Sequence, residues 1–295
     1  MRHIDLHTHS TASDGSCTPS ELVGQAEELG LAAIALTDHD TVSGLQEFLA
    51  RGEGSPVRLV PGVEVAVNWN YRELHILGFF VGDNCAQLNT LLEEIRHNRD
   101  GRNDLIIAKL RESGLDITME EVLEIANGES VGRPHISKIL VNKGYFKDNK
   151  AVFSTCLARG GSGYVPRILP EPAAAIAAIH AAGGVAFWAH PAHRDKSDTS
   201  TIRSTLQYLL GLGLDGVEAY YPEFSPKQHQ TVMAIAAELK IPISGGSDYH
   251  GVNQPGIDLG SGRGGLDVPE ELYHKIVEYH SRKSGVRSQE SEARS

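Results

Sequence analysis

Short apolar runs alternate with stretches of helical spacing over the first hundred residues. The runs that predict strands are residues 3–9, 32–37, 58–60, 64–67 and 74–81. A helix is predicted to begin after Thr18, because Pro19 suits the first helical position and Glu21 completes a capping box. Strands that alternate with helices predict an α/β fold, with a mainly parallel sheet covered by helices.

The middle of the chain keeps only the helical period. Apolar residues recur at helical spacing over residues 86–113, a second capping box begins at Thr118 with a helix expected to end near Gly128, and Pro134 can open a third helix. A flexible return follows at residues 160–163. We therefore predict a small helical insertion over residues 100–165 within a β/α domain formed by residues 1–99 and 166–281.

The β/α alternation resumes after the insertion. The predicted strands are residues 185–189, 216–219 and 243–247, and the predicted helices are residues 172–182, 206–212, 226–239 and 266–281. The final segment, residues 282–295, is polar, and we expect it to be a disordered tail.

Composition and charge restrict the partners. The formal net charge of −11 over 295 residues disfavours a protein that holds long nucleic acid through its phosphates. Bound divalent ions can nevertheless supply local positive charge for a small phosphate compound. The three cysteines, Cys17, Cys85 and Cys156, match no CxxC pattern and indicate free thiols in a reducing cytoplasm. With no signal peptide and no long apolar run, we expect a cytoplasmic protein without membrane association.

Histidine is the unusual residue, with fourteen copies. His7 and His9 end the first predicted strand, where residues two apart point to the same face. Further clusters at or near predicted strand ends contain Asp38, His39, Asp40, Glu64, His75, His190, Asp248 and His250. Because α/β barrels place their active-site groups at strand ends, we expect these side chains to converge on one metal site.

The residue types fit a particular group of metals. Histidine combined with carboxylates suits zinc, manganese or iron better than calcium, which prefers oxygen ligands alone. A carboxylate such as Glu64 can bridge two ions, and bridged ions about 3.5–4 Å apart can activate water and clamp a phosphoryl group.

Six segments resemble, in order, the motifs of the PHP (polymerase and histidinol phosphatase) family: DLHTHSTASDG, ALTDHD, PGVEV, LHILG, WAHP and GSDYHG. The resemblance implies a distorted seven-stranded (β/α) PHP barrel with a small helical insertion. It also implies two or three divalent ions, with manganese as the first choice and zinc or iron as alternatives.

Carried over by motif, the resemblance assigns ligands to each ion. His7, His9 and Asp248 would bind the first ion, which Glu64 would bridge to a second. The second ion would be completed by His75 and His190, and the third would be held by Asp14, His39 and His250. Glu64, Asp248 and His190 would serve catalysis, with a metal-bridging hydroxide as the nucleophile. Asp5 and Asp38 would orient imidazoles.

The insertion, which contains GRPHIS, resembles the branch of nucleoside 3',5'-bisphosphate phosphatases and 5'-3' exoribonucleases. This likeness implies a hydrolase that removes the 3'-phosphate from adenosine 3',5'-bisphosphate and leaves AMP. The sequence HPAHR departs from the shorter His-Pro-x-Arg pattern of the family. The alternatives are an exonuclease on short 5'-phosphorylated RNA ends, a histidinol-phosphate phosphatase, or a non-catalytic metal-binding module. No obligate protein partner is evident.

Basic residues in and beside the insertion are candidates for binding a second phosphate, as part of a substrate lid. These candidates are Arg99, Arg102, Arg133 and His135, since guanidinium groups and helix N-termini bind phosphate. Arg96 and Arg111 are instead interpreted as surface charge. Tyr220 and Tyr221 could stack on a base or pack in the core, and His193 is disfavoured as the proton donor to the leaving oxygen.

Overall fold

The computed structural model describes residues 3–70, 72–126, 131–192 and 198–292, with side chains described as far as residue 285. The chain divides into two compact units. Unit 1 comprises Met1–Leu92 and Pro170–Ser295, and unit 2 comprises Glu93–Leu169. Unit 2 includes the predicted insertion and extends beyond it at both ends.

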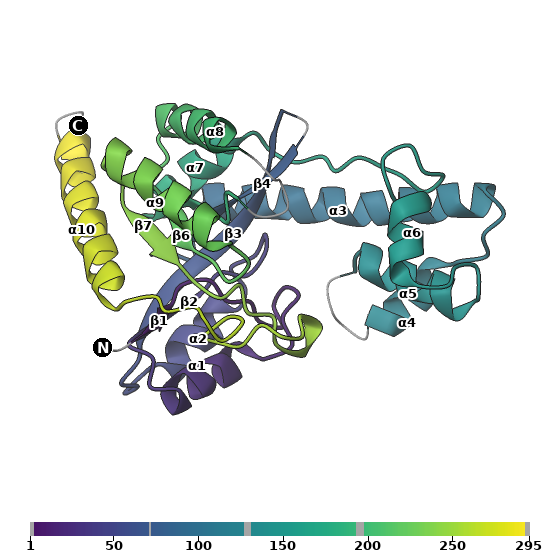
Figure 1. Cartoon of the computed structure of the whole chain (residues 1–295), viewed down its shortest axis with the longest axis horizontal. Helices are drawn as coiled ribbons and strands as arrows, with labels where there is room; N and C mark the ends of the chain where they lie inside the picture. Colours follow the sequence, from purple (N-terminus) through teal and green to yellow (C-terminus); the bar gives the residue numbers. More distant parts are fainter. Residues whose placement is uncertain (1–2, 71, 127–130, 193–197, 293–295) are drawn as a thin grey trace. The chain divides into compact units, whose positions relative to one another are not determined.

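Unit 1 is built around a seven-stranded sheet whose spatial order follows the chain (Figure 1). The strands are β1 (Ile4–Asp5), β2 (Ala33–Leu36), β3 (Arg58–Trp69), β4 (Arg72–Phe79), β5 (Val185–Trp188), β6 (Gly216–Tyr220) and β7 (Ile243–Gly245). All neighbours are parallel except β4, which is antiparallel to both β3 and β5. The backbone N–H of Leu6 donates to the carbonyl of Gly245, and Thr8 pairs with Tyr249, so the segments after β1 and β7 close the barrel. The predicted distorted barrel is confirmed.

The strand β3 runs without a break through Pro61 and Gly62, where the sequence analysis expected two separate strands. A Cβ atom on Gly62 would lie 2.8 Å from the carbonyl oxygen of Gly78 and 2.9 Å from that of Leu36. Glycine therefore allows the neighbouring strands to approach β3 closely at this point, and it does not end the strand.

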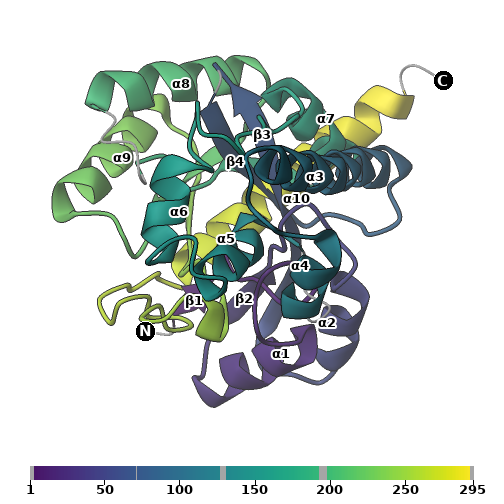
Figure 2. The same cartoon turned by 90° about the vertical axis from the view of Figure 1, so that its right-hand side faces the viewer.

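Helices surround the barrel of unit 1. They are α1 (Pro19–Glu28), α2 (Leu45–Arg51), α7 (Pro172–Ala181), α8 (Thr199–Gly211), α9 (Pro226–Leu239) and α10 (Glu271–Glu292), with a short 3₁₀ turn at Gly251–Asn253. Figure 2 shows α1 and α2 on one flank of the strands and α8 and α9 on another. The reciprocal hydrogen bonds between Thr18 and Glu21 confirm the predicted capping box. α8 begins seven residues earlier than predicted, because Asp198 caps it by accepting from the N–H of Thr201.

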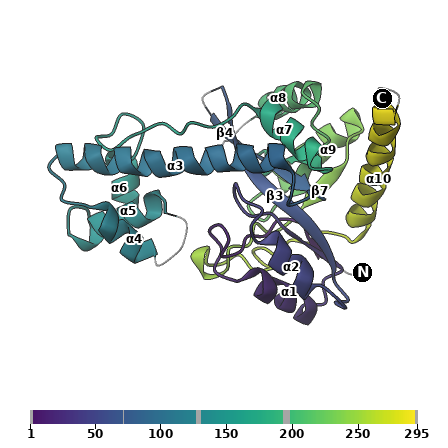
Figure 3. The same cartoon turned by 180° about the vertical axis from the view of Figure 1, so that it is seen from behind.

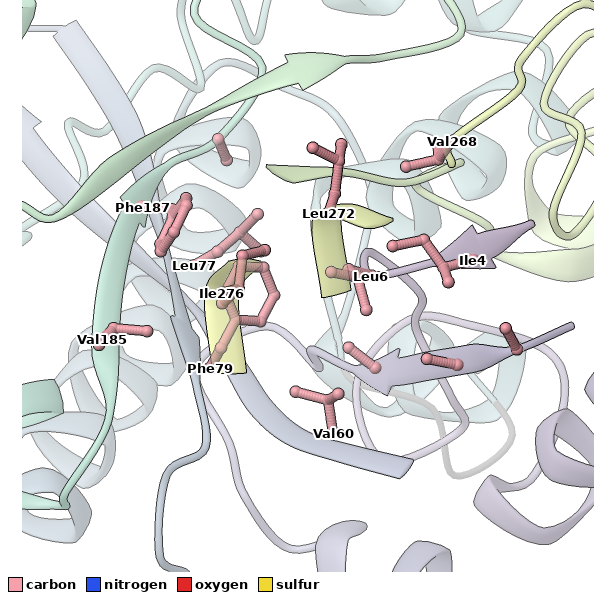
Figure 4. Packing of buried hydrophobic residues seen from close by; sticks show 14 residues of the cluster. Ile4, Leu6, Val60, Leu77, Phe79, Val185, Phe187, Val268, Leu272 and Ile276 are labelled. Atoms are coloured by element: carbon pink, nitrogen blue, oxygen red, sulfur yellow. The ribbon is translucent and has the colours of Figure 1, made fainter. Parts of the chain in front are cut away.

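The helix α10 closes one end of the barrel. Leu272 and Ile276 pack among buried side chains near the beginnings of the parallel strands, including Ile4 and Val185 (Figure 4). α10 continues as a helix to Glu292, through most of the segment that the sequence analysis expected to be disordered. Pairing between residues four apart, such as Glu278 and Arg282, supports a helix in such a polar segment.

Unit 2 is a small helical assembly with its own core. It contains the later part of α3 (Ala86–Glu112), α4 (Met119–Ala126), α5 (Arg133–Asn142) and α6 (Asn149–Thr155), of which α6 was not predicted. Figure 3 shows α4, α5 and α6 on one side of this part of α3. The core includes Ile106, Val122, Ile136 and Val152, one from each helix. The predicted helix end near Gly128 lies outside the described residues. None of the described helices combines the length and apolar character that a bilayer span requires.

Candidate metal centre

The side chains predicted to bind metal meet at the edge of the barrel where the parallel strands end. His7 and His9 follow β1, His39 follows β2, Glu64 lies within β3, and His190 follows β5. His75 lies near the start of β4, which is the same edge because β4 is antiparallel to its neighbours. Asp14, Asp248 and His250 complete the set from the loops after β1 and β7. The structure therefore brings all nine predicted ligands together within unit 1.

The carboxylate of Glu64 lies at the centre of the cluster and is fully buried. Its Oε2 is 3.2 Å from Nε2 of His7, 3.3 Å from Nε2 of His9 and 3.0 Å from Nδ1 of His39. Its Oε1 is 2.8 Å from Nδ1 of His75 and 3.1 Å from Nε2 of His190. The two oxygens thus face different sets of imidazoles, as a carboxylate bridging two ions requires.

A first ligand set combines His7, His9, Glu64 and Asp248. Oδ1 of Asp248 is 3.3 Å from Nε2 of His7 and 3.1 Å from Nε2 of His9. Among the described residues, Nε2 of His7, both ring nitrogens of His9 and Oε2 of Glu64 are buried without a hydrogen-bond partner. Buried polar atoms that face one another without hydrogen-bond geometry are costly unless a cation lies between them, so these donors fit a metal ion.

Two further sets share members with the first. One contains His39, Glu64 and His75, and the other contains His9, Asp14, His39 and His250. A neutral imidazole offers one acceptor nitrogen, so His9 and His39 can each serve one ion at a time. If His9 serves the first set and His39 joins Asp14 and His250, the donors divide into three groups. Glu64 is then the only residue that belongs to two of them. The cluster could hold two or three ions in this way.

Two buried aspartates support the loops that carry the ligands. Asp5 accepts hydrogen bonds from the N–H and hydroxyl of Ser247 and from the N–H of Gly260. Asp38 accepts from the N–H and hydroxyl of Ser10 and from the hydroxyl of Ser13. The prediction that these two aspartates orient imidazoles is therefore wrong, because their oxygens hold loop backbone and hydroxyl groups instead.

The group that does orient an imidazole was missed by the sequence analysis. Glu218, in the middle of β6, lies 2.9 Å from Nδ1 of His7, and both side chains are fully buried. The only signal in the sequence is a charged residue inside the apolar run of a buried strand. Glu73 lies 3.1 Å from Nε2 of His75 and was missed in the same way.

Two ligand residues have backbone angles that side chains other than glycine rarely adopt. φ is 32° at His190 and 56° at Asp248. Such conformations cost of order 1 kcal/mol or more and persist only where neighbours enforce them. The N–H of His190 donates to Glu218 and that of Asp248 donates to the carbonyl of His7, so hydrogen bonds hold both residues in place.

Charge within the cluster favours cations. Burial alone would raise the pKa values of Glu64 and Asp248, yet the neighbouring imidazoles hold both well below their ordinary range. Burial would lower the pKa of His75, but the carboxylates of Glu64 and Glu73 raise it to about 10. The buried carboxylates thus attract protons to the histidines, and metal ions compete with protons for such donors.

The tyrosines considered for base stacking have other contacts. Tyr221 is buried, and its hydroxyl donates to Oδ2 of Asp248 over 2.9 Å. Burial and the nearby carboxylate of Asp248 raise the pKa of Tyr221, so the hydroxyl remains a donor. Tyr220 packs edge-on against His229 and belongs to the surroundings of the barrel core. Tyr221 therefore belongs to the packing alternative, whereas Tyr220 is partly exposed and both alternatives stay open for it. The candidate His193 lies outside the described residues.

The predicted phosphate-binding residues lie in unit 2, where three of them contact other residues of the same unit. Nε of Arg102 donates to the carbonyl of Val165 over 2.8 Å, and Arg102 is buried. The guanidinium of Arg133 lies 5.8 Å from the ring centre of Phe153. Nδ1 of His135 accepts from the N–H of Gly132 at the start of α5. These contacts fix Arg102 within the helical assembly, whereas Arg99, Arg133 and His135 are partly exposed.

A buried cluster of histidines and carboxylates at the open edge of a distorted β/α barrel defines a metal-dependent phosphoesterase, a hydrolase of phosphoric esters. The model of the PHP domain matches residues 5–179, more than half of the chain. The chain belongs to the PHP family.

Curated relatives cover most of this chain. A 5'-3' exoribonuclease Rnm from Escherichia coli is 34% identical over 259 residues, which are 87% of each protein. A 3',5'-nucleoside bisphosphate phosphatase from Chromobacterium violaceum is 33% identical over 88% of this chain and 91% of its own length. A phosphoribosyl 1,2-cyclic phosphate 1,2-diphosphodiesterase from Eggerthella lenta is 30% identical over 84% of this chain and 94% of its own.

Solved structures have the same fold. An amidohydrolase from Chromobacterium violaceum with bound sulfate superposes with a TM-score of 0.79 at 31% identity, covering 93% of this chain and 97% of that one. A protein from Bifidobacterium adolescentis assigned as a metal-dependent phosphoesterase gives a TM-score of 0.78 at 29% identity, covering 94% and 96%. The likeness therefore includes both units of the chain.

Proposed function

We propose that this protein is a phosphomonoesterase that removes the 3'-phosphate from nucleoside 3',5'-bisphosphates, such as adenosine 3',5'-bisphosphate. The observation that carries the proposal is the division of donors around Glu64, which suits at least two adjacent ions. The bisphosphate phosphatase of Chromobacterium violaceum, similar over nearly its whole length, supports this choice of substrate.

The residues of this chain hold and orient the reacting groups. His7, His9 and Asp248 would bind one ion, and His75 and His190 another, with Glu64 shared between them. Bound divalent ions supply water activation and charge neutralisation for the phosphate in such sites. The buried side chains around Glu64 form an environment of low dielectric constant. This environment strengthens the electrostatic interactions of these groups.

Manganese is the proposed metal, with zinc or iron as alternatives, because mixed imidazole and carboxylate donors suit all three. Chelation should abolish hydrolysis and added manganese should restore it. A metal-free preparation, verified by elemental analysis, that keeps full activity would contradict the proposal. A preparation that binds manganese but hydrolyses no phosphate ester would favour the non-catalytic alternative.

The proposal assigns recognition of the second phosphate to basic residues of unit 2, with Arg99 and Arg133 as the principal candidates. One charge-assisted contact contributes roughly 1.5–3 kcal/mol, or about ten- to a hundredfold in kcat/KM. Arg99→Ala and Arg133→Ala should lower kcat/KM for the 3',5'-bisphosphate by about this factor and leave the 3'-monophosphate almost unchanged. Arg111→Ala, on the same helix as Arg99, is the control. Equal losses on both substrates would remove the two arginines from this role.

A 5'-3' exoribonuclease is the second candidate, supported by the 34% identity to Rnm from Escherichia coli. The two functions differ in the bond that is cleaved. With short 5'-phosphorylated RNA, an exonuclease releases successive nucleoside 5'-monophosphates, whereas a phosphomonoesterase releases inorganic phosphate from a mononucleotide bisphosphate. Comparing kcat/KM for RNA of two to ten nucleotides with that for the bisphosphate decides between them. A higher value for RNA at every length would overturn the primary proposal.

A further inference from the structure

The carboxylate of Glu218 contacts two of the residues that face Glu64. Its Oε1 lies 2.9 Å from Nδ1 of His7, and its Oε2 accepts from the backbone N–H of His190 over 2.7 Å. His7 belongs to the donors on one side of Glu64 and His190 to those on the other side. One buried side chain is thus linked to both halves of the cluster.

The contact with His7 selects the tautomer of that ring. A carboxylate accepts hydrogen bonds, so Nδ1 of His7 carries a proton, and the neutral ring has its lone pair on Nε2. That Nε2 is the atom that faces Glu64 and Asp248 without a hydrogen-bond partner among the described residues. Glu218 therefore leaves His7 in the form that can bind a metal, and it fixes the direction of the lone pair.

The contact with His190 acts on the backbone. His190 has a φ of 32°, which a residue other than glycine adopts only when its surroundings enforce it. The hydrogen bond from its N–H to Glu218 is a charge-assisted contact in a buried environment, so it can offset this strain. In this conformation, Nε2 of His190 lies 3.1 Å from Oε1 of Glu64.

We propose that Glu218, on β6, is a positioning residue for the metal centre. It would orient one ligand of each of two adjacent ions: the ring of His7 and the backbone of His190. The inference rests on the proposed metal-dependent function but not on the identity of the substrate. A carboxylate is needed because both of its oxygens accept at the same time. The amide of glutamine has one accepting oxygen, so Glu218→Gln can satisfy either His7 or His190 but must direct its NH₂ group at the other donor.

A buried carboxylate next to the same strand offers a matched control. Asp215 immediately precedes β6 and is also buried. Its Oδ2 lies 2.8 Å from Nε2 of His180 and accepts from the N–H of Ala186 over 2.8 Å. Asp215 therefore contacts an imidazole and a backbone N–H, as Glu218 does, but neither partner is a predicted metal ligand. Asp215→Asn measures the effect of losing such a carboxylate on the fold alone.

The test is manganese binding by the full-length protein, measured by competition with a chelator of known affinity. Loss of an outer partner of a metal ligand typically weakens metal affinity by about 10–100-fold, and we expect a loss of this size for Glu218→Gln. Asp215→Asn should bind manganese as the wild type does, although its thermal stability should fall. Equal weakening in both variants, or affinity within about twofold of the wild type in a folded Glu218→Gln, would overturn the proposal.

A second measurement does not depend on any variant. In the wild type loaded with zinc, which is diamagnetic, ¹⁵N chemical shifts of the His7 ring should show a proton on Nδ1 and none on Nε2. A neutral His7 with its proton on Nε2 would overturn the proposal even if Glu218→Gln failed to fold. Neither measurement uses a phosphate ester, so an error in the proposed substrate would leave both results interpretable.

Discussion

The hydroxyl of Tyr221 donates to Oδ2 of Asp248, while Oδ1 of the same carboxylate faces His7 and His9. The tyrosine therefore fixes the rotation of a predicted metal ligand, with its own ring buried. Tyr221 directly follows β6, the strand that carries Glu218.

Tyr221→Phe should weaken the binding of the ion that we propose His7, His9 and Asp248 hold. The ring is retained, so the loss reports the single hydrogen bond to a charged acceptor, about 1.5 kcal/mol or more, which corresponds to roughly tenfold in affinity. Activity should recover as manganese is raised. The measurement is kcat as a function of free manganese. A wild-type metal dependence together with a lower kcat would indicate that Tyr221 acts on the substrate instead.

Glu64→Gln should remove most of the activity. The carboxylate faces five imidazoles from a fully buried position, and an amide cannot offer two equivalent anionic oxygens to two ions. The fall in kcat should exceed the roughly 10²–10³ that follows the loss of one stabilising donor. Asp215→Asn is the control, since Asp215 is also buried but its partners His180, Ala186 and Lys283 are not predicted metal ligands. A loss below tenfold with unchanged metal content would remove Glu64 from the bridging role.

The convergence of the candidate metal ligands could be predicted from the sequence because strand ends in a β/α barrel meet at one edge. Each ligand motif follows or lies within a strand whose apolar pattern is evident, and β4 is antiparallel without disturbing this relation. The helix starts at Thr18 and Thr118 were predictable because capping uses side chains three residues apart.

Other features depend on contacts between distant parts of the chain. The pairing of Glu218 with His7 joins residues 211 positions apart, and the charge of Glu218 within an apolar strand does not identify its partner. The position of α10 depends on Leu272 and Ile276 packing at the end of the barrel, and Lys283 contacts Asp215. These tertiary contacts, together with pairing between residues four apart such as Glu278 and Arg282, support the helix past residue 281, where the sequence alone indicated a polar tail.

Gly246→Ala should disturb the junction where the barrel closes. A Cβ atom on Gly246 would lie 2.3 Å from the backbone nitrogen of His7 and 2.5 Å from its Cβ. Neither backbone can move without separating the segments after β1 and β7 that close the barrel. Such overpacking typically costs about 1–3 kcal/mol, and displacement of His7 should also weaken metal binding.

Thermal unfolding and manganese titration of the same preparation test both effects. Gly101→Ala is the control, because Gly101 lies inside α3 with no described neighbour within 4 Å of the added Cβ, and alanine should stabilise the helix by about 0.5–1 kcal/mol. A Gly246→Ala protein with normal stability and normal metal affinity would show that the segments after β1 and β7 can accommodate the added methyl group.

Asp215 should contribute stability that disappears in acid. Burial alone would raise the pKa of Asp215, but contacts with His180 and Lys283 lower this pKa to about 2 in the folded protein. In the unfolded chain the pKa returns to about 3.9. A group whose folded pKa is depressed stabilises the protein above its unfolded pKa, and this contribution is lost as the pH falls through the folded value. The side chain is almost fully buried, so the difference corresponds to about 2–3 kcal/mol.

The measurement is the free energy of unfolding in urea, with chelator present, for the wild type and Asp215→Asn between pH 7 and pH 2. The asparagine variant cannot ionise at this position, so the difference between the two proteins isolates the titration of Asp215 from that of the metal ligands. The difference should be constant from pH 7 to about pH 5 and shrink by roughly half of the 2–3 kcal/mol at pH 3. A difference that stays constant down to pH 2 would mean that Asp215 does not hold a depressed pKa, and that its contacts with His180 and Lys283 stabilise the fold without favouring the ionised carboxylate.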